Sequence, residues 1–267
     1  MRIALLGTVP DASGSVRPEL QDVLPEGAEL SAWPSRAGVF PATPVEQHLQ
    51  AIGHIEAGFR AAGAGADAVV IDSVGDYGLT ALKTGLGIAA VGAGEAGLAA
   101  AAALGRFAIV TVWPASMNFV PEGLLRAYGH EDHCIGIRNV GAEQVIDRRD
   151  GPNGYLARVD RADPDVLSTV IAAIEATITE GAEAVLLGCT CMSRMAEQLA
   201  TAVSVPVINP LAEAVKLAIA QAQEAPPPFK RLRSTRGPLL TRMIDAIAQE
   251  PDEQCPVCVV SDLVEAV

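Results

Sequence analysis

Short apolar runs alternate along this chain with longer stretches in which apolar residues recur at helical spacing. The runs are rich in Val, Ile, Leu and Ala, a composition typical of strands that are buried on both faces of a parallel sheet. We predict strands at residues 2–7, 68–71, 88–91, 107–112, 136–140, 184–187 and 206–208. Helical spacing predicts helices at residues 44–62, 79–84, 94–104, 164–179, 193–202, 211–223 and 239–247.

The longest predicted helix shows its spacing most clearly, because its large apolar residues recur at intervals of three or four. These residues are Val45, Leu49, Ile52, Ile55 and Phe59, and we expect the face that they form to be the helix's packing surface. Strands that alternate with helices of this length are joined by right-handed crossovers, which predicts an α/β fold with parallel sheets.

An internal repeat is the most informative feature of the sequence. Residues 65–73 match residues 181–189 at a constant offset of 116, and Val91 and Val207 end the following predicted strands at the same offset. The segment 2–6 also resembles 106–110. Chance similarity between two βα units of an Ala- and Val-rich chain is the alternative interpretation, but it does not account for a constant offset over two successive strands.

The repeat predicts two similar α/β lobes, each a parallel sheet flanked by helices. We assign residues 1–97 and 209–267 to the first lobe and residues 98–208 to the second. Ligands of such sheets bind beyond the carboxyl ends of the strands, so we expect an active site in a cleft between the lobes.

Composition supports this fold class and narrows the function. Half of the residues are hydrophobic but only 4% are aromatic, and the formal net charge is −13. The acidic balance argues against nucleic acid as a partner, although Lys230, Arg231, Arg233 and Arg236 form one basic cluster. The apolar runs are too short to span a membrane or to form the core of a signal peptide. With an odd number of cysteines, five, the sequence favours a cytoplasmic protein over a disulfide-stabilised secreted one.

The carboxyl end of the strand at 184–187 is the main candidate for chemistry. Cys189 lies in the turn from this strand into a helix, where backbone N–H groups and the helix dipole favour the thiolate. A small buried hydrophobe is the alternative role for a cysteine, and we favour that role for Cys191. The repeat places Ser73 at the position equivalent to Cys189.

Two other cysteine-containing segments have motif-like spacing but weak support. His130, His133 and Cys134 occupy a polar loop, and Cys255 and Cys258 form a single CxxC pair. Neither segment completes a ligand set of the usual spacing, so we predict no metal site. The sequence leaves the role of the C-terminal tail undefined.

Several motifs resemble those of the aspartate/glutamate/hydantoin racemase superfamily. Leu187-Gly188-Cys189-Thr190-Cys191-Met192 with Val205-Pro206-Val207-Ile208-Asn209-Pro210 resembles the second half of these proteins. Residues 73–79 and 91–96 resemble the first half-site of the hydantoin and allantoin racemase branch. The resemblance covers roughly residues 1–223. It implies two pseudosymmetric lobes around a cleft, no cofactor, and homo-oligomers.

The resemblance also implies a mechanism in which two cysteines lie on opposite faces of the substrate. One thiolate removes the α-proton and the other thiol delivers a proton to the far face. The second cysteine maps to Cys189 and the first maps to Ser73, which is a departure from the pattern. An alcohol is a much weaker acid than a thiol and needs a neighbouring base, a part that Asp72 or Asp76 can play. Capping of the following helix is the alternative role for Asp76.

The resemblance and the repeat together predict the surroundings of a small-molecule substrate that bears a carboxylate or a cyclic imide. The residues expected there are Thr8, Val74, Gly75, Asp76, Thr111, Trp113, Gly188 and Thr190. Our leading hypothesis is a cofactor-independent racemase or epimerase that acts at the α-carbon of an amino acid or hydantoin-like compound. The alternatives are a one-cysteine lyase such as a decarboxylase, a cysteine-dependent hydrolase, and a catalytically silent binding protein.

Overall fold

The computed structural model describes residues 1–11, 13–146, 154–224 and 237–247. The chain forms two compact units. Of the described residues, the first unit contains those of 1–72 and 76–92 together with those from Ala214 onward, and the second contains those of 73–75 and 93–213. The predicted basic cluster at 230–236 and the Cys255–Cys258 pair lie outside the described residues.

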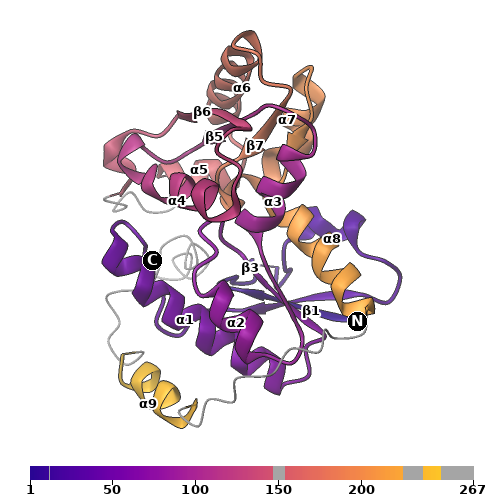
Figure 1. Ribbon diagram of the computed structural model, residues 1–267, viewed down its shortest axis with the longest axis vertical. Helices are drawn as coiled ribbons and strands as arrows, with labels where there is room; N and C mark the ends of the chain where they lie inside the picture. Colours follow the sequence, from indigo (N-terminus) through magenta and orange to yellow (C-terminus); the bar gives the residue numbers. More distant parts are fainter. Residues whose placement is uncertain (12, 147–153, 225–236, 248–267) are drawn as a thin grey trace. The chain divides into compact units, whose positions relative to one another are not determined.

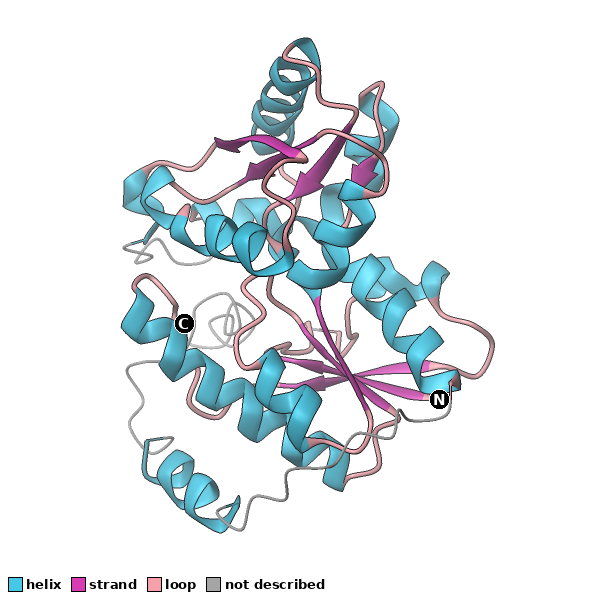
Figure 2. Ribbon diagram, in the orientation of Figure 1, coloured by secondary structure: helices cyan, strands magenta, loops and turns pink. Residues whose placement is uncertain are grey.

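The first unit is built on a four-stranded parallel sheet in the order β2-β1-β3-β4 (Figures 1 and 2). Helices α1 and α2 lie side by side against this sheet (Figure 1). Helix α8 begins in the second unit and continues in the first. The elements are β1 (Arg2–Leu6), the 3-10 helix η1 (Pro18–Val23), β2 (Glu29–Trp33), α1 (Pro44–Gly63), β3 (Ala68–Ile71), α2 (Leu79–Gly85), β4 (Ala89–Gly92), α8 (Pro210–Gln223) and α9 (Gly237–Ile247).

The second unit repeats this plan with a four-stranded parallel sheet in the order β6-β5-β7-β8 (Figure 2). Helices α3 and α4 cover one face of the sheet, and α6 lies on the other (Figure 1). The elements are α3 (Ala93–Ala102), β5 (Phe107–Thr111), η2 (Ala115–Met117), α4 (Phe119–Tyr128), β6 (Cys134–Asn139), η3 (Glu143–Ile146), α5 (Tyr155–Asp160), α6 (Pro164–Thr179), β7 (Ala184–Leu187), η5 (Thr190–Met195), α7 (Ala196–Ala202) and β8 (Val207–Ile208).

The predicted repeat is confirmed by strand order and by the pairing register of the two middle strands of each sheet. Ile3 pairs with Ala68 in the first sheet, and Phe107 pairs with Ala184 at the equivalent place in the second. The two sheets also share a hydrogen bond at equivalent positions. In each, the acidic side chain just before β3 or β7 accepts from a backbone N–H at the start of the neighbouring strand, β1 or β5. Asp67 accepts from Arg2, and Glu183 accepts from Arg106, both at 2.7 Å.

Burial explains why strands β3, β5 and β7 could be predicted from the sequence. Every residue of β3, β5 and β7 is buried, and apart from Thr111 at the end of β5 all of these residues are apolar. Edge strand β2 is partly exposed and carries Glu29 and Ser31, and this polar pattern hid it from the prediction. Helices α4 and α5 were also missed.

The packing surface predicted for α1 is wrong for three of its five residues, although Ile55 does pack against the core of the first unit. Val45 is 71% exposed, and Leu49 and Phe59 are each 42% exposed. The buried face carries small and polar residues instead: Gln50, Gly53, His54, Glu56, Ala57, Gly58 and Ala61. The small residues allow a close approach, since a side chain at Gly58 would begin 2.4 Å from Leu82 of α2.

Candidate functional site

Cys189 caps the first turn that follows β7. Its Sγ accepts a hydrogen bond from the backbone N–H of Cys191 at 3.2 Å, and the side chain is almost entirely buried. The predicted strand-to-helix turn is therefore present, with the difference that a 3-10 helix, η5, precedes α7. A sulfur that accepts from an N–H group at a helix start is electrostatically suited to carry negative charge in its reduced form.

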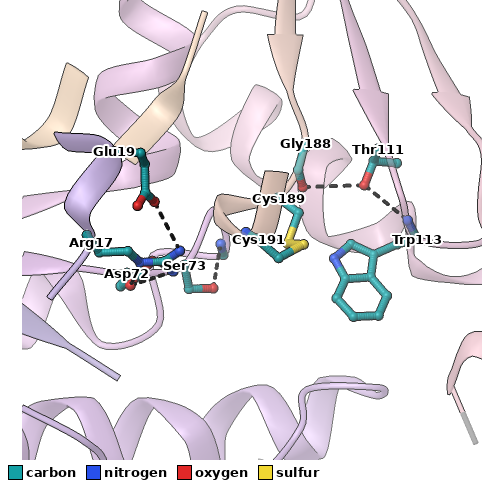
Figure 3. Close-up of a disulfide and its surroundings, with 10 residues drawn as sticks. Arg17, Glu19, Asp72, Ser73, Thr111, Trp113, Gly188, Cys189 and Cys191 are labelled. Atoms are coloured by element: carbon teal, nitrogen blue, oxygen red, sulfur yellow. Dashed lines mark hydrogen bonds and ion pairs between the residues drawn. A yellow bond between two sulfur atoms is a disulfide. The ribbon is translucent and has the colours of Figure 1, made fainter. Parts of the chain in front are cut away.

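The same sulfur is bonded to a second cysteine. Cys189 and Cys191 form a disulfide, and their Cα atoms are 5.2 Å apart (Figure 3). The sequence predicted Cys191 to be a buried hydrophobe, and it is indeed 5% exposed, but it also forms this bond. A sulfur in a disulfide neither takes up nor delivers a proton, so acid/base chemistry at Cys189 belongs to the reduced form.

Thr111 ties the end of β5 to the backbone immediately before Cys189. Its hydroxyl donates to the carbonyl of Gly188 at 3.4 Å and accepts from the N–H of Trp113 at 3.3 Å (Figure 3). Gly188 has no room for a side chain, because a Cβ there would lie 2.5 Å from the Cβ of Thr111. In this structure the Thr111 hydroxyl thus holds the cysteine turn in place.

A pair of asparagines fixes the loop after β5. Asn139 of β6 donates to the carbonyl of Trp113 at 3.0 Å and to the side chain of Asn118 at 2.8 Å, and Asn118 donates back at 3.2 Å. This network positions the backbone of Trp113, whose side chain is partly buried.

Ser73 follows β3 in the same local geometry that Cys189 shows after β7. Its Oγ accepts from the backbone N–H of Gly75 at 3.2 Å, as the Cys189 sulfur accepts from the residue two positions on. The backbone before each residue is also anchored alike: Asp72 donates to Leu6 of β1, and Gly188 donates to Val110 of β5. The Ser73 hydroxyl and the Cys189 sulfur therefore lie at equivalent strand ends and have the same backbone hydrogen bonds around them.

Asp72, the residue before Ser73, does not serve as the base that the sequence suggested. Both of its carboxylate oxygens accept from Arg17, whose Nε and Nη2 lie 2.8 Å away, and Thr8 donates its hydroxyl proton at 2.6 Å. Glu19 lies 3.5 Å from Nη1 of the same arginine (Figure 3). The Asp72 side chain is 2% exposed, and its oxygens are engaged by a guanidinium and a hydroxyl, so they are not directed at the Ser73 hydroxyl.

Asp76 is buried, as a substrate-binding or structural residue would be, but it does not cap α2. The residue at the N-cap is Gly78, with no side-chain cap hydrogen bond. Asp76 has a left-handed backbone conformation, with φ of 49°, and its side chain fills the space beside Gly92 of β4.

A buried histidine supports the segment that follows Asp76. His54 of α1 shares hydrogen bonds with the Gln50 side chain at 2.8 Å and with the carbonyl of Tyr77 at 3.3 Å. Since a carbonyl can only accept, Nδ1 carries the proton and Nε2 accepts from the amide. Burial lowers the pKa of His54 to about 4, so the ring is neutral at neutral pH.

The predicted site residues fall into three groups. Thr111, Trp113 and Gly188 make direct contacts near Cys189 and Thr190 in the second unit. Residues 73–75, which include Val74 and Gly75, also group with that unit. Thr8 and Asp76 belong to the first unit.

Sequence reasoning missed the contribution of Arg17 and Glu19. Both lie in a segment rich in Gly, Ser and Pro that has no periodicity. The available signal was a lone arginine in that segment and an aspartate at the end of an apolar strand, since such a carboxylate requires a partner when buried.

The described part of the chain holds no candidate for a metal centre or a membrane-spanning helix. No three His, Cys, Asp or Glu side chains there are grouped so that they could hold a metal ion. None of the helices described is both long and apolar enough to cross a membrane.

The chain is similar to known racemases in sequence and in fold. The chain is 34% identical to a hydantoin racemase of Rhizobium meliloti over 156 residues, which is 58% of this chain and 59% of that protein. It is 30% identical to a hydantoin racemase of Pseudomonas sp. (strain NS671) over 65% of each chain. The matches thus span about three fifths of the length of these curated relatives.

Among solved structures, the allantoin racemase from Klebsiella pneumoniae is similar with a TM-score of 0.68 and 25% identity, over 82% of this chain and 86% of that one. An arylmalonate decarboxylase shares the fold, with a TM-score of 0.57 at 16% identity over 84% of this chain and 94% of the other. The protein is therefore an α/β protein with two four-stranded parallel sheets flanked by helices, as in racemase-fold structures. The model of the Asp/Glu/Hydantoin racemase family matches residues 7–218, and the chain belongs to this family.

Proposed function

We propose that this protein is a racemase or epimerase of a hydantoin-like compound or an amino acid that acts by proton transfer at the α-carbon. Family membership and the similarity to hydantoin racemases support the reaction class. The observation that carries the assignment of residues is the matched geometry of Ser73 and Cys189, each of which accepts an N–H hydrogen bond at 3.2 Å at an equivalent strand end.

In the proposed reaction, the reduced Cys189 thiolate removes the α-proton from one face of the substrate. The carbanion is stabilised as an enolate on the adjacent carbonyl, and Ser73 donates its hydroxyl proton to the opposite face. A thiol with a pKa of about 8.5 supplies thiolate near neutral pH, whereas an alcohol is the weaker acid. Proton delivery from Ser73 is therefore the slower half of the reaction.

Proton exchange in deuterated water tests this proposal directly. Fully reduced protein is incubated with 5-substituted hydantoins, allantoin and amino acids, and the loss of the α-proton signal in NMR spectra is compared with the loss of optical rotation. We expect both losses with at least one cyclic substrate. Exchange without loss of rotation would restrict the chemistry to the Cys189 face, and absence of both would exclude racemisation of the panel.

A one-cysteine decarboxylase is the second candidate function. It is favoured by one observation: of the two equivalent strand ends, only the end of β7 is followed by a thiol. Such an enzyme releases CO2 from a malonate derivative and adds a single proton from Cys189. Release of CO2 with incorporation of one deuterium, in the absence of exchange on hydantoins, would favour this candidate over the racemase.

A further inference from the structure

The two equivalent strand ends differ in the residue that precedes the reactive side chain. Gly188 precedes Cys189 and has no space for a side chain, whereas Asp72 precedes Ser73 and carries a buried carboxylate. A carboxylate next to a proton-donating hydroxyl is unfavourable for the reaction, since its charge opposes the negative charge that develops on the substrate.

Arg17 counters that charge with a geometry that a lysine cannot reproduce. Its Nε and Nη2 donate to the two oxygens of Asp72 at 2.8 Å each, and the arginine side chain is 13% exposed. Thr8 adds a third donor, at 2.6 Å. Together these bonds hold the Asp72 carboxylate from two sides, and through its backbone they fix the starting point of the turn that carries Ser73.

The backbone of Arg17 indicates that this placement is imposed by the surroundings. Arg17 has φ of 46° and ψ of 64°, in the left-handed region that residues other than glycine rarely adopt. It also caps η1 through its carbonyl, which accepts from Leu20 at 3.0 Å. Strained conformations of this kind persist where neighbouring contacts determine them, and they are concentrated at functional sites.

We infer that Arg17 is a positioning residue for proton delivery by Ser73: its fork on Asp72 neutralises the carboxylate and fixes the end of β3. This inference rests on the proposed function. Arg17 acts through Asp72 and does not touch the substrate. It therefore affects delivery to the Ser73 face while leaving proton abstraction by Cys189 unchanged.

The ratio of inversion to exchange measures this role. With a substrate on which the reduced wild-type protein both exchanges and inverts, Arg17→Met is expected to lower kcat for inversion by about 10- to 100-fold, the cost of a misplaced reacting group. KM and the exchange rate on the Cys189 face stay within about twofold, because abstraction does not involve Arg17. Arg17→Lys, which keeps the charge without the fork, is expected to recover only part of the loss.

Two further variants separate positioning from general destabilisation. Arg17→Met with Asp72→Asn removes the unpaired charge and is expected to restore part of the inversion rate. Arg60→Met is the matched control, since Arg60 binds the buried carboxylate of Glu56 through Nε at 2.9 Å. This control is expected to lose stability without a change in the ratio.

The outcomes distinguish the inference from the function on which it rests. No exchange in the wild-type protein refutes the proposed function itself. An unchanged ratio in Arg17→Met, or an equal loss of exchange and inversion in a folded variant, overturns the role of Arg17 while the racemase assignment stands. If Arg17→Met does not fold, the ratio in Arg17→Lys decides the question on the same criteria.

Discussion

At the scale of single residues, each of the two proposed catalytic side chains receives a hydrogen bond from a neighbour close to it in the sequence. Cys189 and Ser73 each accept from an N–H group two residues later, so the turn itself supplies their hydrogen-bond donor. Cys191 has a double role, since its N–H stabilises the Cys189 sulfur and its own sulfur bonds to it. Cys189 is thus available for proton transfer only when its bond to the Cys191 sulfur is reduced.

The disulfide predicts that activity depends on thiol reduction. The wild-type protein is expected to lose racemisation in oxidised dithiothreitol and to regain it in reduced dithiothreitol, because exchange interconverts the disulfide and the thiol pair. Cys191→Ser removes the partner, so its activity should be the same in both. Cys134→Ser, which changes the free cysteine of β6, is the control and should behave like the wild type. Equal sensitivity of Cys191→Ser and the wild type would contradict the prediction.

At the scale of elements, two helix glycines test how tightly helices pack on the second sheet. A Cβ at Gly97 of α3 would lie 2.7 Å from Pro210 and 2.9 Å from Leu186, whereas one at Gly123 of α4 would have no neighbour within 4 Å. Gly97→Ala is therefore expected to destabilise the fold by about 1–3 kcal/mol through overpacking. Gly123→Ala should stabilise it by about 0.5–1 kcal/mol, since alanine favours helix. Urea unfolding measures both, and destabilisation by the two substitutions alike would refute the packing argument.

The buried His54 on α1 makes the free energy of unfolding depend on pH. Its pKa falls from 6.5 to about 4 in the folded protein, so the unfolded chain takes up the proton first as the pH falls. The stability is complete above pH 6.5 and is lost toward pH 4, with a loss of about 2 kcal/mol by pH 5. His54→Gln is expected to lack this dependence. His48→Gln, on the exposed side of the same helix, should retain it, and a flat wild-type profile between pH 7 and 5 would be inconsistent with a neutral buried ring.

The elements also show how far the sequence could predict this structure. Predicted strands at 68–71 and 184–187 match β3 and β7 residue for residue, because strands buried on both faces leave an unbroken apolar run. The face of α1 could not be read in this way, since its packing surface relies on small residues and the Gln50–His54 contact. Arg17 could not be placed because its partner Asp72 lies 55 residues away, and only the tertiary fold brings the two together.

At the scale of the whole molecule, the chain repeats one sheet topology but carries different side chains at the equivalent strand ends. Both sheets have the same strand order and the same register between their two middle strands. An acidic residue, Asp67 in the first sheet and Glu183 in the second, accepts a hydrogen bond at the start of each. The strand ends then diverge into an alcohol beside an Arg17–Asp72 pair and a thiol beside a second cysteine. A duplicated fold with unequal ends favours unequal rates on the two faces of a substrate, which a symmetric pair of thiols would not show.

Making the two ends chemically alike tests this asymmetry. Ser73→Cys places a thiol where the repeat has its equivalent, in a turn whose Gly75 N–H is already directed at the side-chain heteroatom. Because a thiol ionises far more readily than an alcohol, inversion is expected to accelerate at least about tenfold, within the range of general acid–base contributions. Exchange should be nearly unchanged. Polarimetry and α-proton exchange on the fully reduced protein measure the two rates, with the exposed Ser168→Cys on α6 as the control. A slower inversion in Ser73→Cys would mean that Ser73 anchors the substrate and does not deliver the proton.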